Sequence, residues 1–186
     1  MFNNLPKGLL PLTSIFLRDA VEVFQDYKKS ALLLCTCFCD WKCCTELGRD
    51  KSMCQNSTLK EVAIKKIPFS EIFDMVTRNT VIDAVIFGGL EPFIQINQVI
   101  QCIEYLRERG MTKDILIYTG YYIEEIDEAI IERLKESDVI LKCGRYIPDR
   151  PPKFDDILGV TLASDNQYSI ELKSNNYHKG GCNNGS

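Results

Sequence analysis

The clearest structural signal in the sequence lies in residues 83–110, which read DAVIFGGLEPFIQINQVIQCIEYLRERG. Residues 83–87 are a short, continuous apolar run, which predicts a strand buried on both faces that ends at two glycines. After Pro92, apolar residues recur at the spacing of an amphipathic helix, and Gly110 follows as a typical C-terminal stop. These residues therefore predict one strand and one helix of a βα unit.

The same pattern recurs along the chain. Apolar runs typical of buried strands lie at residues 30–35 (SALLLC), 114–118 (DILIY) and 138–142 (DVILK), and a second amphipathic helix, with acidic residues on its outer face, is expected at residues 123–134. Continuously apolar strands that alternate with helices are typical of parallel sheets. We therefore expect an α/β fold with a curved, mostly parallel sheet.

Weaker signals flank this central part. Residues 13–17, 61–65 and 168–172 are possible strands. Ser70 is a candidate N-cap for a further helix, because it follows Pro68 and precedes apolar residues at helical spacing. These elements would extend the central βα units on both sides.

The chain has the size of one domain. It contains 186 residues with a mass of 21.3 kDa, enough to bury about 70% of its unfolded surface. We expect a single domain over residues 1–173, in which residues 1–29 form a poorly defined N-terminal extension. Residues 174–186 are rich in Asn, Gly and Ser, which predicts a disordered tail.

Composition and charge exclude several classes of protein. The apolar share of 45% and the charged share of 26% are those of globular proteins. No apolar run reaches the roughly 18–20 residues of a membrane-spanning helix, so we expect no membrane association. The net charge of −4 and the lack of a basic stripe argue against nucleic acid as a partner. Residues 1–11 are a poor secretory signal, which favours a cytoplasmic location.

The cysteines are the most unusual feature of the composition. There are nine, and six of them fall within residues 35–54. An odd number of thiols in a chain of ordinary core composition indicates a reducing compartment, where clustered thiols usually bind metal or do redox chemistry. His178 is the only histidine, so His-rich zinc sites and Ser-His-Asp triads lack their parts.

The chemically distinctive residues follow the predicted strands. Ligands of parallel α/β sheets bind beyond the carboxyl ends of the strands, so these residues predict one shared site. They are the cysteine-rich stretch, Gly88-Gly89-Leu90-Glu91-Pro92, Thr119-Gly120-Tyr121 and Lys142-Cys143-Gly144-Arg145. No C-x-x-C pair of the kind found in zinc ribbons occurs, which favours an iron–sulfur cluster over zinc or unligated redox thiols.

At this point the residues match a known family. The segment Cys39-Asp-Trp-Lys-Cys43, together with Cys54-Gln55-Asn56, resembles the cluster motif of the small radical S-adenosylmethionine enzymes, and specifically of the activating proteins of anaerobic ribonucleoside-triphosphate reductase. Those proteins place two residues between the second and third cysteine, whereas ten residues separate Cys43 from Cys54 here. Glu46 stands where the usual spacing puts the third cysteine, and Cys44 is a rival to Cys54 for that role.

Further segments extend the resemblance over about residues 30–172. Residues 88–92 resemble the Gly-Gly-Glu-Pro strand end of the family, with Leu90 inserted before Glu91. The other matches are Tyr118-Thr119-Gly120-Tyr121, Gly144-Arg145-Tyr146 and Ser164-Asp165-Asn166-Gln167. They point to the activators rather than to radical enzymes in general.

The resemblance implies a fold, a site and an activity. The fold would be an incomplete β/α barrel. A [4Fe-4S] cluster held by Cys39, Cys43 and Cys54 would leave one iron open for S-adenosylmethionine, which would be bound by Gly88, Gly89, Glu91, Thr119 and Lys142. Reductive cleavage would yield a 5′-deoxyadenosyl radical, which would install a glycyl radical on a partner, most simply anaerobic ribonucleotide reductase.

The resemblance also implies an electron donor, a reduced flavodoxin or ferredoxin. Two alternatives stay open on the sequence. One is a radical enzyme that acts on a small molecule or peptide, against which the lack of an extra substrate domain argues. The other is a non-enzymatic iron–sulfur or zinc protein.

Overall fold

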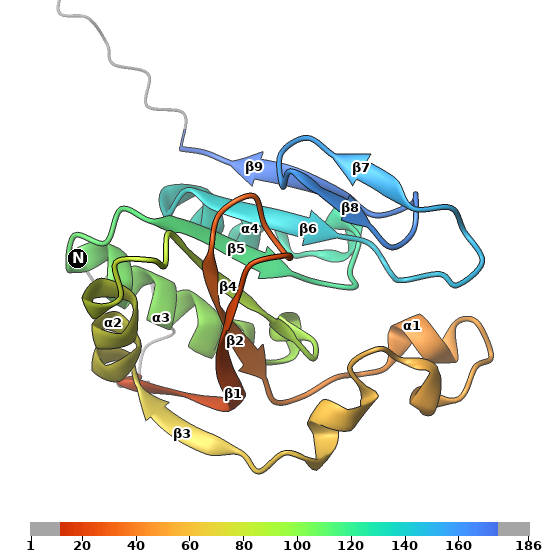
Figure 1. Ribbon diagram of the computed structural model, residues 1–186, viewed down its shortest axis with the longest axis horizontal. Helices are drawn as coiled ribbons and strands as arrows, with labels where there is room; N and C mark the ends of the chain where they lie inside the picture. The colour runs from red at the N-terminus through yellow and green to blue at the C-terminus, as the bar shows by residue number, and fades with distance from the viewer. Residues whose placement is uncertain (1–11, 175–186) are drawn as a thin grey trace, which may run out of the picture.

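The computed structural model describes residues 12–174. They form a seven-stranded sheet with helices on one face and a separate two-stranded ribbon on the other (Figure 1). The strands of the sheet are β1 (Ser14–Val23), β2 (Ala31–Thr36), β3 (Lys65–Pro68), β4 (Ala84–Gly89), β5 (Asp114–Tyr118), β6 (Val139–Cys143) and β9 (Tyr168–Leu172). The ribbon is β7 (Lys153–Asp155) and β8 (Val160–Leu162), and the helices are α1 (Lys42–Thr45), α2 (Phe69–Arg78), α3 (Ile96–Glu108) and α4 (Glu128–Glu136).

The sheet is mixed, with a parallel centre. Its strand order is β3-β1-β2-β4-β5-β6-β9. The pairs β2–β4, β4–β5 and β5–β6 are parallel, whereas β1–β2, β1–β3 and β6–β9 are antiparallel. The expectation of a mostly parallel sheet therefore holds for the centre and is wrong for the edges. The direction in which an edge strand pairs depends on segments far away in the sequence, which a local pattern does not report. The sheet is open, and the incomplete barrel stays a prediction.

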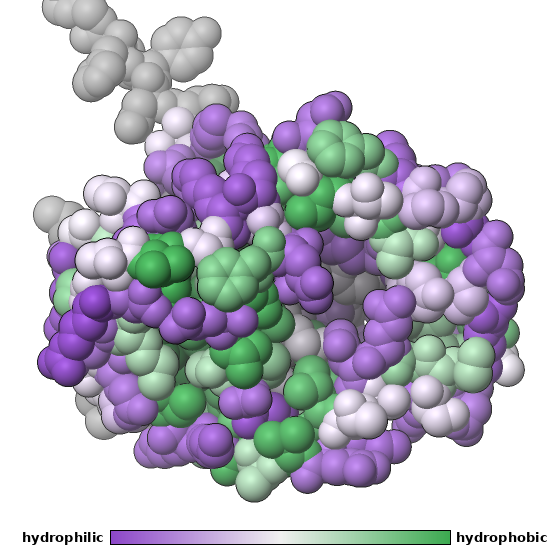
Figure 2. All heavy atoms as spheres, viewed as in Figure 1, coloured by the Kyte–Doolittle hydropathy of each residue, from purple (hydrophilic) through white to green (hydrophobic). Residues whose placement is uncertain are grey.

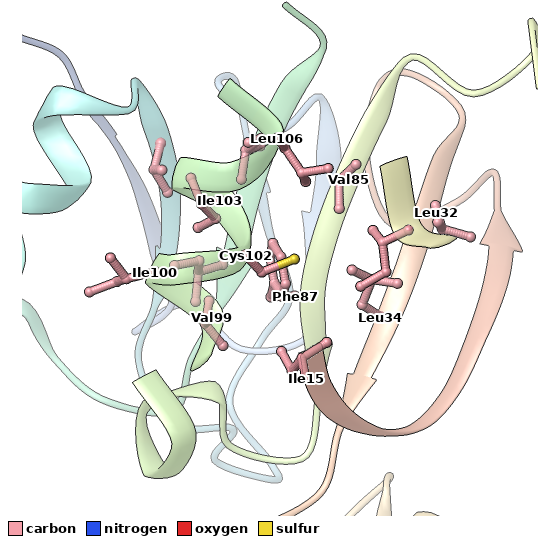
Figure 3. Close-up of a cluster of buried hydrophobic side chains, with 14 of the residues drawn as sticks. Ile15, Leu32, Leu34, Val85, Phe87, Val99, Ile100, Cys102, Ile103 and Leu106 are labelled. Atoms are coloured by element: carbon pink, nitrogen blue, oxygen red, sulfur yellow. The ribbon is translucent and has the colours of Figure 1, made fainter. Parts of the chain in front are cut away.

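Helices α2, α3 and α4 cover one face of the sheet. Alternate residues of the central strands point to this face, and α3 packs against them through its apolar side (Figure 3). Phe87 of β4 and Val99 and Ile103 of α3 have no exposed surface. Gly110, with a φ of 79°, ends α3 in the left-handed conformation that the sequence suggested. Burial of this apolar surface is the main source of stability.

The opposite face is covered more thinly. The ribbon β7–β8 and the connection 24–30 between β1 and β2 pack on it through Tyr27, Leu158 and Leu162. The side chains that alternate with the helix-facing ones, such as Ile86 and Leu116, belong to this second cluster. Within residues 12–174, no layer of helices covers this face. The carboxyl ends of the central strands are therefore accessible to a ligand from this side.

Several predicted boundaries are corrected by the structure. Residues 57–61 form a 3-10 turn, and the strand begins later, at Lys65. Helix α2 starts directly after Pro68 with no side-chain cap, so Ser70 is not its N-cap. The helix expected at residues 123–134 is split into a 3-10 turn and α4.

Other sequence predictions are confirmed. The strand at residues 168–172 is β9, and residues 13–17 begin the longer strand β1. The predicted tail lies outside the described residues, except for its first residue. None of the helices within residues 12–174 combines the length and apolar character needed to cross a membrane.

Candidate functional site

A cavity of about 290 Å³ opens beyond the carboxyl ends of β4, β5 and β6. Its volume is just below the range of roughly 300–1,000 Å³ found for ligand pockets. The surface is hollowed between the end of β6 and the segment around α1 (Figure 2). Most of the predicted site residues line this cavity: Cys39, Cys43, Cys54, Gly89, Glu91, Thr119 and Lys142.

The first two cysteines are placed by a tight turn and a short helix. Trp41 has a left-handed backbone with a φ of 62°, and its N–H donates a hydrogen bond to Sγ of Cys39 at 3.3 Å. Helix α1 follows, with Cys43 in its only turn. A Cβ atom at Gly120 would lie 3.0 Å from Sγ of Cys43, so the missing side chain at Gly120 leaves room for this sulfur.

Cys54 reaches the same cavity from the inserted loop. A short 3-10 turn precedes it, and Asp50 caps this turn by accepting a hydrogen bond from the N–H of Ser52 at 2.8 Å. Two residues after Cys54, Nδ2 of Asn56 donates to the carbonyl oxygen of Gly89 at 2.6 Å. The loop is thereby fixed to the end of β4, so the ten-residue gap does not carry Cys54 away from the other two cysteines.

Cys44 also lines the cavity and is only 4% exposed. Both candidates for the third ligand therefore reach it. Burial raises the pKa of Cys39 to about 12, and it also raises the pKa values of Cys43 and Cys44. These thiols are protonated at neutral pH, so binding of iron must displace their protons.

The other cysteines of residues 12–174 are buried away from the cavity. Cys102 points from α3 into the core, and burial strongly raises its pKa (Figure 3). The remaining three are at most 4% exposed and are absent from the cavity lining: Cys35, Cys37 and Cys143. They behave as small core residues, which is common for buried cysteine. His178 and Cys182 lie outside the described residues.

Glu91 is the buried carboxylate of the site. It is 6% exposed, and its side chain accepts hydrogen bonds from Oγ1 of Thr119 at 2.7 Å and from the N–H of Gly120 at 2.9 Å. Burial raises its pKa above the ordinary value, while these two donors act in the opposite direction. The inserted Leu90 therefore does not remove Glu91 from the cavity.

Lys142 is a half-buried cation of the site. It follows the apolar part of β6 and pairs with Tyr118 in the register of β5 and β6. Burial lowers the pKa of Lys142 to about 8. Within residues 12–174, its ammonium group makes no hydrogen bond and no ion pair, either with Glu91 or with another residue. An unpaired cation in a half-buried position can bind an anionic ligand.

The two glycines at the end of β4 have different roles. Gly89 lines the cavity with a φ of 80°, and a Cβ there would lie 3.1 Å from the Cα of Cys35. Gly88 does not line the cavity. It lies in the sheet, where an added Cβ would be 3.2 Å from Cδ1 of Leu33 and 3.5 Å from Cβ of Tyr118. Only Gly89 is thus placed to contact a ligand directly.

An ion-pair network ties the cysteine-bearing segment to the sheet. The side chain of Arg145, 5% exposed, pairs with Glu125 through two bonds of 2.7 Å and with Glu46 at 2.6 Å. This guanidinium lowers the pKa of Glu125 to about 2. A further hydrogen bond of 2.6 Å runs from the hydroxyl of Tyr121 to Asp40.

The sequence interpretation missed this network. Glu125 was expected on a plain solvated helix face, and Glu46 was noted only for its position in the motif. Nothing in the sequence links Arg145 to Glu46, which lies 99 positions away. The pairing gives Glu46 a structural role at the position where the motif that this segment resembles has its third cysteine.

The donor set fits a cluster better than a single ion. Within residues 12–174, no group of three or more His, Cys, Asp and Glu side chains is placed to hold one metal ion. A four-iron cubane instead takes each thiolate on a different iron, so its ligands surround a volume rather than a point. Four soft sulfur donors around one cavity suit that geometry and that metal.

Comparison with known proteins gives one match. Residues 34–162 match the model of a family described as 4Fe-4S single cluster domain. All of the predicted cysteine ligands and all of the predicted ligand-binding residues fall within this range. No curated protein matches the chain, and no solved structure matches it either.

Proposed function

Because this chain belongs to the 4Fe-4S single cluster domain family, we propose that its cluster serves the reductive cleavage of S-adenosylmethionine. In this proposal the cluster is held by Cys39, Cys43 and Cys54, and one iron is left free for the ligand. When bound, the cluster supplies the electron that breaks the carbon–sulfur bond, giving methionine and a 5′-deoxyadenosyl radical. As part of the same proposal, the open sheet would correspond to an incomplete β/α barrel.

The observation that carries the proposal is the pair of opposite charges beside the sulfurs. Glu91 and Lys142 line the same cavity as the cysteines and do not pair with each other. The methionine part of S-adenosylmethionine carries an ammonium and a carboxylate, which are the complementary charges. The ammonium group of Lys142 makes no hydrogen bond or ion pair within residues 12–174, so it is available to the carboxylate of a ligand.

The chain's own residues would position the ligand and exclude water. Thr119 and the N–H of Gly120 hold the carboxylate of Glu91 in place, so that it can accept from an ammonium group. Gly89 brings the backbone of β4 to the cavity wall, and its missing side chain leaves room for Cys35 and Leu59 beside it. A water-excluding cavity protects a radical from side reactions.

We further propose that the product radical acts on a glycyl-radical enzyme, with anaerobic ribonucleotide reductase as the partner. The radical removes a hydrogen atom from a glycine Cα of the partner, giving 5′-deoxyadenosine and a glycyl radical. A reduced flavodoxin or ferredoxin would supply the electron. The support is the similarity of Thr119-Gly120-Tyr121 and Gly144-Arg145-Tyr146 to the activators, together with their position at the cavity.

The test is an anaerobic reconstitution with iron and sulfide, followed by dithionite and S-adenosylmethionine. We expect 5′-deoxyadenosine from the wild type and from Cys44→Ala, and none from Cys39→Ala or Cys54→Ala. Adding the reductase should give a glycyl-radical signal in electron paramagnetic resonance. A reconstituted protein with full iron content and no 5′-deoxyadenosine would refute the proposal.

The second candidate is an electron carrier without enzymatic activity. The observation that favours it is the position of Cys44, which would give the cluster a fourth thiolate from the same cavity. Such a cluster would have no free iron. Loss of the cluster in Cys44→Ala, together with a spectrum that S-adenosylmethionine does not change, would establish this alternative.

A further inference from the structure

Trp41 is a left-handed residue that lies outside both hydrophobic cores. It is the only tryptophan of the chain, and its backbone has a φ of 62°. A positive φ is rare for a bulky side chain, and such residues collect at sites where the strained backbone serves a function. Its side chain is half-buried and belongs to neither core cluster. Packing of the core therefore does not account for this residue.

The backbone of Trp41 joins the first two cysteines of the site. Its N–H donates a hydrogen bond to Sγ of Cys39 at 3.3 Å. Its carbonyl oxygen accepts from the N–H groups of Cys44 and Thr45, both at 2.9 Å, and from Oγ1 of Thr45 at 3.1 Å. These bonds close the single turn of α1, which carries Cys43. The left-handed conformation of Trp41 thus connects the sulfur of Cys39 to the helix of Cys43.

The side chain of Trp41 reaches the loop that carries Cys54. The ammonium group of Lys51 lies 5.7 Å from the centre of the indole ring, which is within the range of a cation–π contact. The carbonyl oxygen of Lys51 accepts a hydrogen bond from the N–H of Cys54 at 3.2 Å. Within residues 12–174, the ammonium group of Lys51 makes no hydrogen bond and no ion pair. The indole ring is therefore the partner that the structure gives to this lysine.

We propose that Trp41 is a positioning residue for the cluster, and that its contact with Lys51 holds the loop of Cys54 in place. The inference rests on the ligand set of the proposed function, which is Cys39, Cys43 and Cys54, and it does not require cleavage of S-adenosylmethionine. Trp41 then links all three ligands, two through its backbone and the third through its ring. This link compensates for the ten-residue gap before Cys54, in a segment with little buried surface.

The contact between Trp41 and Lys51 should act on the retention of iron. A thiolate that leaves the cluster rebinds readily while its loop stays close, because its effective concentration at the iron remains high. Without the contact, the loop of Cys54 would move away more often, and iron would be lost faster. The sheet does not take part in this contact, so its stability should not change.

The experiment measures how fast the reconstituted protein loses iron to a ferrous chelator without oxygen. The variants are Trp41→Asn, Lys51→Met and the double variant. Asn also adopts the left-handed conformation, so Trp41→Asn removes the ring and keeps the turn, whereas Trp41→Phe keeps a ring. The matched control is Lys60→Met, because Lys60 is exposed in the same segment and lies over no aromatic ring within residues 12–174.

We expect iron release to be about three-fold faster in Trp41→Asn and in Lys51→Met than in the wild type, as the strength of an exposed cation–π contact allows. The double variant should also be about three-fold faster, because both substitutions remove the same contact, whereas independent effects would multiply to about nine-fold. Trp41→Phe and Lys60→Met should stay within about two-fold of the wild type. Urea unfolding of the iron-free variants should match that of the wild type, which separates a positioning role from a structural one.

Independent effects in the double variant, or equal rates in all proteins, would overturn the role of Trp41 and leave the proposed function in place. A lower free energy of unfolding in iron-free Trp41→Asn would also overturn it, because the residue would then act on the fold. A wild type that holds the cluster and forms no 5′-deoxyadenosine would instead overturn the proposed cleavage and leave the role of Trp41 intact. A wild type that binds no cluster would overturn both.

Discussion

Lys142 and Gly89 show how single residues shape the cavity. Lys142 brings a positive charge that has no partner within residues 12–174, and Gly89 has no side chain. An apolar residue would suit the strand better than Lys142, whereas the left-handed backbone of Gly89 favours glycine. Residues that are unfavourable for the fold and that line a cavity are expected at ligand sites.

The proposed function predicts that replacing Lys142 with methionine weakens binding of S-adenosylmethionine by ten-fold or more, because the proposed charge-assisted contact to the ligand carboxylate would be lost. Iron content should not change, since Lys142 is not a ligand of the cluster. Equilibrium dialysis and iron analysis measure the two quantities. Lys173→Met is the control, because Lys173 is exposed and pairs with Glu171 instead. Equal affinities in the two variants would contradict the role given to Lys142.

Gly89→Ala should lower the free energy of unfolding by about 2 kcal/mol, because it combines a left-handed backbone with a close contact to Cys35. Gly48→Ala is the matched control, since Gly48 has a φ of 61° and no atom near its added Cβ. It should cost only the conformational part, about 1 kcal/mol. Urea denaturation of both variants measures the difference, and equal losses would show that the contact at Gly89 is harmless.

At the scale of elements, Arg145 joins three pieces of chain. It follows β6, and it binds Glu125 of the 3-10 turn before α4 and Glu46 directly after α1. Helix α1 has four residues, too few to be stable in isolation. Its position beside the sheet therefore depends on these side-chain contacts.

The Glu125 contribution to stability should depend on pH. Its pKa falls from an ordinary value of 4.5 to about 2 in the folded protein. The stabilisation is therefore fully present above pH 4.5 and is lost as the pH falls toward 2. Thermal unfolding of the wild type and Glu125→Gln should differ at pH 7 and converge near pH 2. A difference that is the same at both pH values would show that the ion pair contributes nothing.

The elements differ in how far the sequence predicts them. Strands β4, β5 and β6 were located because each is apolar on both faces, which is a local property. The antiparallel edges were not predicted, because β1 and β9 find their partners through pairing that no local pattern reports. The cysteines and the strand-end residues were recognisable by chemical type. The pairing of Glu46 with Arg145 was not, because two charged residues distant in the sequence carry no sign that they meet.

At the scale of the whole molecule, the sheet and the cysteine-bearing segment are built differently. Between residues 38 and 62, Cys44 is the only buried residue, whereas the central strands β2 and β4 are buried almost throughout. The segment projects beyond the carboxyl end of the sheet (Figure 1). Its side chains add little to the core, so few buried contacts hold this segment in place.

Removing iron should therefore loosen this segment and leave the sheet folded. Trypsin should cut the metal-free protein first at Arg49, Lys51 or Lys60, and the reconstituted protein should resist cleavage there. Mass spectrometry of the early fragments identifies the sites, and circular dichroism checks that the sheet persists. Equal cleavage rates with and without iron would contradict the prediction.

The exposed character of residues 38–62 has a consequence for how the protein matures. A protein whose sheet folds before the cluster binds can lose the cluster and bind a new one without unfolding. Damage by oxygen would then strip the inorganic part while sparing the polypeptide, and repair would need only fresh iron and sulfide. The same openness would make the empty form a target for degradation, so that supply of metal would govern how long each copy survives.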